Sequence, residues 1–250
     1  MEEYIKSRFL LKYTEEDYKK AKEKYCKLKK FKANENVFDK NPDFDDITHY
    51  YTRLKTQYYI EKAFNSMLIE KDENIAEDLE VGNIGTPGRI AKVWCGYDTH
   101  DDRELGSGRF SVPVRLAKFP NTQKTNIPIT KKIDLISNCS HHFITFSSIR
   151  KPDSYAVISY IPDKFVLGIS KLQRLTNYIA QRFWLQEDLT KALYDEISKA
   201  AETEDVFVGL YEIIHGCETD RGAMGKDGGF TSEYYGGAFL DANLREQVKK

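Results

Sequence analysis

The chain has 250 residues and a formal net charge of −1, with 38 basic and 39 acidic side chains. This balance gives no electrostatic case for binding nucleic acid or a membrane surface. Hydrophobic residues make up 40% of the sequence and aromatic residues 13%, which predicts a folded protein with a sizeable core. No apolar run is long enough to span a bilayer, and the first residues lack the pattern of a signal peptide. With four widely spaced cysteines, we expect a cytoplasmic protein with free thiols.

Residues 1–46 predict a polar, helical N-terminal extension. Thr14 is typical of a helix N-cap because three acidic residues follow it, and acids are favoured in the first turn of a helix. We expect this helix to be stopped by the Asn-Pro-Asp sequence that begins at Asn41. The remainder, residues 47–250, is expected to form the main domain.

The first part of that domain, residues 47–105, is predicted to be helical. Apolar side chains at a spacing close to 3.6 residues predict a helix from Thr48 to about Glu70. A shorter helix is expected from Gly88 to Trp94, with Thr86 as its N-cap and Pro87 at its first position.

Residues 106–250 are expected to alternate between strands and helices. The predicted strands are Phe110–Ala117, Ile127–Ser137, Tyr155–Ile161 and Val206–Ile214, with a short buried stretch at Phe165–Leu167 and helices over Leu172–Trp184 and Gln186–Ala201. The glycine-rich segment 222–237 is expected to be irregular, and a C-terminal helix is expected to begin near Asp241.

Thiol and imidazole side chains gather in two short stretches, Cys139-Ser-His-His142 and His215-Gly-Cys217, and each follows a predicted strand. The C-x-x-H spacing lets one turn aim Cys139 and His142 at one ion, and Cys217 could supply a third ligand. Three protein ligands suit a catalytic zinc site, which keeps one position open. The alternatives are buried core residues or a structural site with a fourth ligand.

Two further groups could bind a nucleotide. Ser170, Lys171 and Arg174 lie at the start of a predicted helix, where backbone N–H groups and cations favour an anion, although a solvated basic face is the alternative. Arg221 could add a contact to the same anion. Glu187, beside Gln186, could accept two parallel hydrogen bonds from guanine, or it could simply favour the helix dipole.

Several motifs together resemble GTP cyclohydrolase I. They are Cys139-Ser-His-His-Phe143, Tyr160-Ile-Pro-Asp-Lys164, Leu167-Gly-Ile-Ser-Lys-Leu-Gln-Arg174, Gln186-Glu-Asp-Leu-Thr190, and His215-Gly-Cys217 with Arg221. Thr86-Pro-Gly-Arg-Ile-Ala-Lys92 is also similar to a segment of that family. The motifs occur in the order and approximate spacing of the family, over about residues 50–245.

The resemblance implies an α+β T-fold subunit, an antiparallel sheet with two helices packed on one face, preceded by an N-terminal helical region. It also implies a toroidal homo-oligomer, commonly a decamer, with active sites between subunits. The implied reaction converts GTP and water to 7,8-dihydroneopterin triphosphate and formate.

Roles follow from the resemblance position by position. Cys139, His142 and Cys217 would hold zinc, and His141 and His215 would transfer protons. Glu187 would anchor guanine, with Gln186 beside it. Ribose and triphosphate would be bound by Ser170, Lys171, Arg174 and Arg221, with Arg89 helping from the N-terminal segment.

The chain departs from the family pattern at several positions. Ser140 stands where the family commonly has glutamate, and Asp188 replaces a common arginine. The stretch Gly222–Gly229 replaces a Ser/Thr-rich one, and the loop from Ser147 to Ser154 is longer than usual.

Two other functions compete with this one. A non-catalytic homologue could keep zinc and nucleotide binding as a scaffold or regulator, but it would not need both proton-transfer histidines. The nitrile reductase of queuosine synthesis uses a cysteine nucleophile and no zinc, which fits the C-x-x-H and H-x-C pair poorly.

Overall fold

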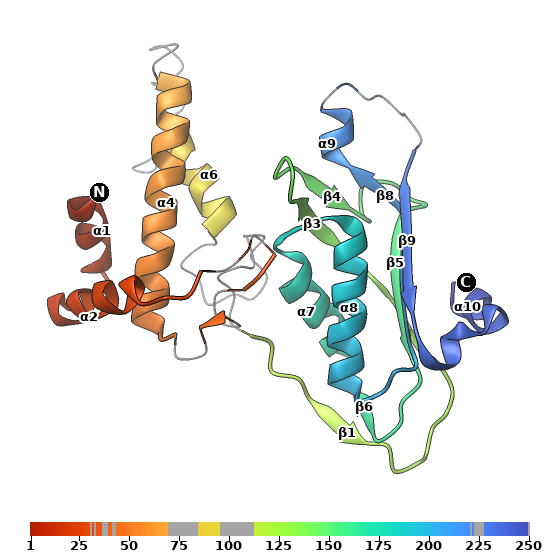
Figure 1. Cartoon of the computed structure of the whole chain (residues 1–250). Coiled ribbons are helices and arrows are strands. Elements are labelled where there is room, and N and C mark those ends of the chain that lie inside the picture. The colour runs from red at the N-terminus through yellow and green to blue at the C-terminus, as the bar shows by residue number, and fades with distance from the viewer. Residues whose placement is uncertain are drawn as a thin grey trace. The chain divides into compact units, whose positions relative to one another are not determined.

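The computed structural model describes residues 1–30, 32, 34–36, 40, 41, 44–69, 85–95, 113–220, 222 and 228–249. These residues form two compact units, Met1–Val112 and Pro113–Lys250 (Figure 1). Among the helices of the described ranges, none combines the length and apolar character that crossing a membrane requires.

The first unit is helical, with α1 (Glu2–Phe9), α2 (Glu15–Cys26), α4 (Asp46–Ile69) and α6 (Gly85–Cys95). An aromatic cluster joins α1 and α2 to α4. Phe9 lies at its centre, with ring centroids 5.5 Å from Tyr18 and 5.6 Å from Tyr50. All three side chains are buried. The N-terminal segment therefore packs on the first long helix of the expected main domain.

The start of α2 confirms the predicted N-cap, but its end differs from the prediction. The Thr14 hydroxyl accepts a hydrogen bond from the Asp17 N–H, and the Asp17 carboxylate accepts one from the Thr14 N–H. The helix ends at Cys26 rather than near Asn41. One reason is that the Asn41 side chain accepts the Lys29 N–H at 2.8 Å, which a continuing helix would have used internally.

The position of α6 also corrects the prediction. The helix begins at Gly85, so Thr86 lies within its first turn and is not the N-cap. Pro87 is tolerated there because the first N–H groups of a helix have no intrahelical acceptor.

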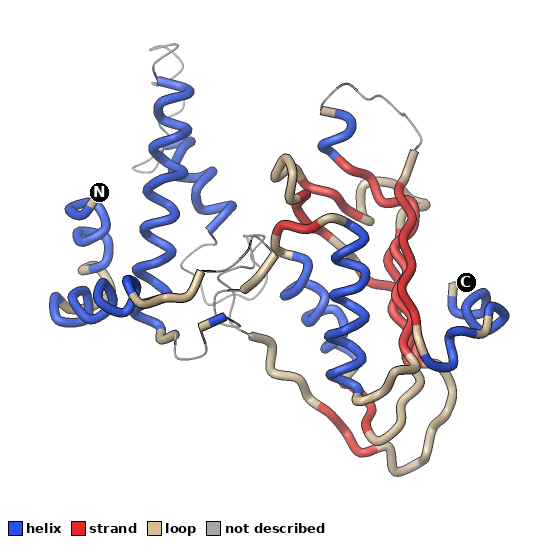
Figure 2. The backbone as a smooth tube through the Cα atoms, in the orientation of Figure 1, coloured by secondary structure: helices blue, strands red, loops and turns tan. Residues whose placement is uncertain are grey.

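The second unit is built on a bent sheet (Figure 2). Its larger part is antiparallel in the order β2 (Ile129–Ile133), β5 (Tyr155–Tyr160), β8 (Val206–His215) and β9 (Phe230–Tyr235). Beyond the end of that part, β8 pairs with β4 (Thr145–Ser147), which pairs with β3 (Ile136–Cys139), and β3 runs parallel to β7 (Phe183–Trp184). A separate hydrogen-bonded pair joins β1 (Lys118–Pro120) and β6 (Phe165–Leu167).

Helices α7 (Ile169–Ala180) and α8 (Gln186–Ala201) cover one face of this sheet (Figure 1). The main core is buried between these helices and the sheet. The other face carries a 3-10 helix, η2 (Gly237–Leu240), and α10 (Ala242–Val248) over a smaller cluster that includes Phe207 and Phe239. This arrangement confirms the expected α+β T-fold with two helices on one face. Asp241 caps α10 by accepting the Asn243 N–H, and the helix begins at Ala242, close to the start that was predicted near Asp241.

Several predicted elements have different limits. Residues 110–112 lie outside the described ranges, and 113–117 are not in a strand. The predicted strand 127–137 is two strands, because the backbone of Asp134 is hydrogen-bonded to the side chain of Gln173 and not to a neighbouring strand. The helix predicted to reach Trp184 ends at Ala180. Strand β9 lies within the segment 222–237, which was expected to be irregular.

Strand β8 contains one extra residue that changes which way its later side chains face. Leu210 pairs with Ser232 and Ile213 with Phe230, so β8 advances three residues while β9 advances two. Glu212, with φ of 51°, lies in this bulge. Val206, Val208 and Leu210 face the helix-covered core, and after the bulge Ile213 faces it instead. The following odd-numbered position, 215, is thereby placed on the helix-covered side.

Candidate functional site

The first half of the site is the tight turn that follows β3. The Cys139 carbonyl accepts the Phe143 N–H at 2.8 Å, and the Cys139 N–H donates to the Ile144 carbonyl at 2.9 Å. Phe143 has a φ of 57° and packs its ring 4.4 Å from that of Phe183. Cys139 is buried, while His141 and His142 are exposed. The turn therefore fixes a buried thiol beside two accessible imidazoles.

The second half is delivered by the end of β8. Cys217 lies in the short helix α9 (Gly216–Thr219), directly after His215. Gly216 is buried and lies against the turn that follows β3. A Cβ added to Gly216 would lie 2.8 Å from Ile144 Cγ2 and 3.0 Å from the Thr145 carbonyl oxygen. A residue without a side chain thus lets the end of β8 approach the turn after β3 closely.

The predicted ligand residues meet at this point. One ligand atom each from Cys139, His142 and Cys217 lies within 4.8 Å of the other two. Zinc bonds of about 2.0–2.3 Å in tetrahedral geometry place ligand atoms roughly 3.3–3.8 Å from one another, so an approach of about 1 Å is required. Two sulfur donors and one imidazole are also the donor types that zinc prefers. The three side chains therefore fit a metal ion.

A cavity of about 430 Å³ opens beside these three residues. It is also lined by His141, His215, Gln186, Glu187 and Glu218, and by residues 230–232 of β9. The two histidines and the Gln-Glu pair expected from the sequence thus reach the same pocket as the metal-ligand group.

His215 is held firmly within this pocket. Its ring stacks on Phe146 at a centroid distance of 4.6 Å and an interplanar angle of 8°, and Phe230 lies edge-on at 5.1 Å. Burial lowers the pKa of His215 below its ordinary value, and the nearby carboxylates of Glu187 and Glu218 oppose this shift only in part. The imidazole is accordingly neutral at neutral pH.

Gln186 and Glu187 have different environments although they are neighbours in the first turn of α8. Glu187 is exposed at the pocket, whereas Gln186 is 4% exposed. The Gln186 amide is hydrogen-bonded to His215, to the Phe230 carbonyl and to Ser232. Its polar atoms are therefore engaged inside the protein, while those of Glu187 face the open cavity.

The expected phosphate-binding residues do not line this pocket. Ser170, Lys171 and Arg174 belong to the first half of α7, whose N-terminus is hydrogen-bonded to Lys131 of β2. The opposite end of α7 leads into β7, beside the metal-ligand turn. The 12 residues of α7 span about 18 Å. Within one chain, the two groups are therefore at opposite ends of this helix.

The two remaining residues that were expected to bind the substrate are Arg89 and Arg221. Arg89 lies on α6 in the first unit, where it is half-buried. Arg221 lies outside the described residues, as does most of the departing stretch after it.

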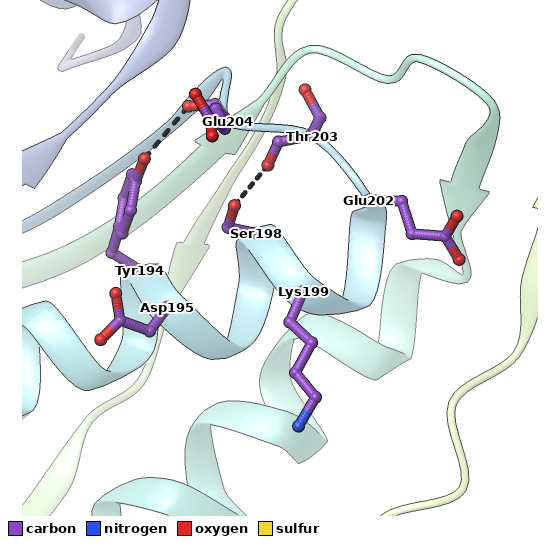
Figure 3. A pocket seen from close by; sticks show the side chains of 7 residues that line it. All are labelled: Tyr194, Asp195, Ser198, Lys199, Glu202, Thr203 and Glu204. Carbon is purple, nitrogen blue, oxygen red and sulfur yellow. Dashed lines mark hydrogen bonds between the residues drawn. The ribbon is translucent and has the colours of Figure 1, made fainter.

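A second hollow, at the C-terminal end of α8, has a different character (Figure 3). The Ser198 hydroxyl donates to the Thr203 carbonyl and the Tyr194 hydroxyl to the Glu204 carbonyl, while Glu202 adopts the left-handed conformation. These groups satisfy carbonyls at and just beyond the helix end. No histidine or cysteine lines this hollow, so the chemistry of the described residues is concentrated at the first pocket.

The pocket residues that were not predicted from the sequence include Glu218, Phe230 and Ser232. Glu218 adjoins the predicted ligand Cys217, so its place next to the motif was a usable signal. Phe230 and Ser232 reach the pocket because they pair with β8, and only the alternation in Thr231-Ser-Glu-Tyr-Tyr235 hints at that strand.

Comparison with known proteins agrees with this geometry. Residues 60–250 match the family model described as GTP cyclohydrolase I. A GTP cyclohydrolase 1 of Blochmanniella pennsylvanica is 33% identical over 174 residues, covering 68% of this chain and 72% of the relative. One from Parabacteroides distasonis is 31% identical over 178 residues, covering 69% and 83%. One from Salmonella gallinarum is 30% identical over 164 residues, covering 65% and 68%. The chain belongs to the GTP cyclohydrolase I family.

Proposed function

We propose that this protein is a zinc-dependent GTP cyclohydrolase I, which converts GTP and water to 7,8-dihydroneopterin triphosphate and formate. The observation that carries the proposal is the convergence of two cysteines and three histidines on one cavity that also exposes Glu187. Two strand ends, remote in sequence, supply these residues. Such a combination suits hydrolytic opening of a purine ring, which needs an activated water, proton-transfer groups and a purine anchor.

Zinc is proposed to be held by Cys139, His142 and Cys217. When bound through three protein ligands, zinc supplies Lewis acidity that lowers the pKa of water at its open position. This site would thereby generate a nucleophile at neutral pH.

The two remaining histidines are proposed to move protons. Half-buried His215 is neutral at neutral pH and can accept a proton, while His141 is exposed to solvent. The aromatic rings on either side of His215 keep its imidazole in one orientation, so the proton it gains is held at a defined place.

Glu187 is proposed to anchor guanine through its N1–H and exocyclic amine. Replacing Glu187 with alanine should weaken GTP binding by about 10- to 100-fold, since hydrogen bonds to a charged group contribute about 1.5–3 kcal/mol. Wild-type protein should also bind GTP more tightly than inosine triphosphate, which lacks the amine, and the variant should lose this preference. Calorimetry on zinc-stripped protein measures both affinities.

Asp188 provides a matched control, because it is the adjacent exposed acid in the same helical turn and does not line the pocket. Asp188→Ala should keep both the affinity for GTP and the preference over inosine triphosphate. Equal losses in the two variants would show that Glu187 acts only through its charge.

The complete site is proposed to form between subunits of a ring. Ser170, Lys171 and Arg174 are suited to bind ribose and triphosphate, but in one chain α7 separates them from the metal-ligand group. A second copy can bring them to the cavity. Among the described strands, β2 pairs only with β5 and β9 only with β8, so each leaves one open edge. Pairing unlike edges of successive copies generates a ring when the rotation closes, as in the proposed toroidal decamer.

A direct assay tests the function. Zinc-loaded protein incubated with GTP should release formate and give a fluorescent pterin after oxidation, in equal amounts. Protein that binds zinc and GTP but releases neither product would contradict the proposal and would favour a non-catalytic member of the family.

A further inference from the structure

We propose that Gln186 is a positioning residue that holds His215 in a single tautomer, with the ring hydrogen on Nε2. This assignment rests on the proposed function, in which His215 acts beside the metal-ligand group. It also gives Gln186 a role different from contact with guanine.

The orientation of the Gln186 amide follows from its neighbours. Its Nε2 atom lies 3.2 Å from the Phe230 carbonyl oxygen and 2.9 Å from Ser232 Oγ. A carbonyl oxygen can only accept a hydrogen bond, so the NH₂ group must face Phe230. The Oε1 atom therefore faces His215 Nε2, at 2.7 Å. Since Oε1 can only accept, His215 Nε2 must carry the hydrogen.

The hydroxyl groups behind Gln186 reinforce this direction. Thr190 Oγ1 donates its one hydrogen to the Gln186 backbone carbonyl at 2.8 Å. In its 2.7 Å contact with Ser232, Thr190 must therefore accept, and Ser232 donates. The remaining lone pairs of Ser232 are then available to accept from the Gln186 amide. Every donor in the chain from Ser232 to His215 is thus assigned without conflict.

The packing around the ring keeps this arrangement in place. His215 is stacked on Phe146 and bounded edge-on by Phe230, so turning the ring over would require both aromatic side chains to move. The Nε2–H bond to Gln186 and the two aromatic contacts therefore act together to keep the ring in one orientation.

The tautomer can be observed by NMR of the full-length, zinc-loaded protein labelled with ¹⁵N-histidine, because protonated and unprotonated ring nitrogens have well-separated shifts. The His215 signals are identified by their loss in His215→Asn. We expect a protonated Nε2 and an unprotonated Nδ1 in wild type. In Gln186→Met, which fills similar space without an acceptor, we expect a mixture of tautomers. The variant should lose about 10-fold or more in kcat, with KM for GTP changed less than about 2-fold.

Two further variants separate this role from simple packing. Gln186→Glu keeps an acceptor oxygen that can face Nε2, and it should keep the wild-type tautomer. Gln57→Met makes the same substitution at a buried glutamine of the first unit, whose amide donates to Glu61, and should leave the His215 signals unchanged.

A wild-type His215 protonated on Nδ1 would overturn the assignment. So would a Gln186→Met variant that keeps one tautomer and instead raises KM for GTP, since that pattern indicates contact with the substrate. If the protein releases no formate yet shows a tautomer that depends on Gln186, the proposed function fails while the positioning role is supported.

Discussion

Replacing Cys217 with serine is expected to remove bound zinc and to lower formate release from GTP by about 10³-fold or more. The metal contributes several kcal/mol of stabilisation to a hydrolytic transition state, and each 1.36 kcal/mol corresponds to a factor of ten. Cys217 is only partly buried on a four-residue helix, so the change should leave the fold of the second unit largely intact. Metal content, formate release and the far-ultraviolet circular dichroism spectrum measure the three expectations.

Cys26 offers the matched control, because it is an exposed free cysteine at the end of α2. Cys26→Ser should keep both zinc content and activity. A Cys217→Ser protein that keeps full activity without bound zinc would contradict the metal mechanism, and one that keeps both zinc and activity would contradict the role of Cys217 as a required ligand.

Two inactive variants are expected to restore activity when they assemble together. Cys217→Ser disables the metal-ligand end of a subunit, and Lys171→Ala with Arg174→Ala disables the proposed triphosphate-binding end. If a site joins these ends from two copies, random co-assembly at equal amounts regenerates about a quarter of the sites. Co-expression with two affinity tags, followed by sequential purification, would isolate mixed oligomers for the formate assay.

The control for this experiment pairs Cys217→Ser with Cys139→Ser. Both substitutions damage the same metal-ligand group, so no mixed site recovers an intact set and activity should stay absent. The mixture of Cys217→Ser with the Lys171→Ala, Arg174→Ala variant could also remain inactive although its oligomers assemble. The metal-ligand end and the triphosphate-binding end would then not combine across subunits.

Most helices and strands were predicted correctly where the pattern of residues within the element itself indicates its structure. Helix α8 was predicted from Gln186 to Ala201 and has those limits, because its apolar positions recur at helical spacing over four turns. Strand β9 was missed because its side chains are mostly exposed or half-buried, and its backbone is ordered by pairing with β8. Phe183 and Trp184 continued a helical pattern, but the parallel pairing of β7 with β3 withdraws them from α7. Such pairings depend on distant residues.

In the site, too, the features carried by a local motif were predicted, and those set by distant residues were not. Cys139, His142 and Cys217 were predicted as one ligand group, because thiolate and imidazole at this spacing suit zinc and the motifs resemble those of the family, and the structure brings them together. The surroundings of Gln186 were not predicted. Its partner His215 is 29 residues away, and Ser232 is 46 residues away. Because Gln186 and Glu187 are adjacent in sequence, one shared role was expected for them. Tertiary packing instead gives the two side chains different environments.

The bulge at Glu212 decides on which side of the sheet His215 lies. If the same residues continued the regular alternation from Leu210 without a bulge, position 215 would turn toward the face that carries α10, away from Gln186. The ligand Cys217 would shift with it. Active relatives that lack the bulge should therefore be one residue shorter between Leu210 and Ile213, so that their equivalent of His215 keeps its side of the sheet. Gly229, whose added Cβ would lie 2.4 Å from the Glu212 backbone, leaves the space that the bulge occupies.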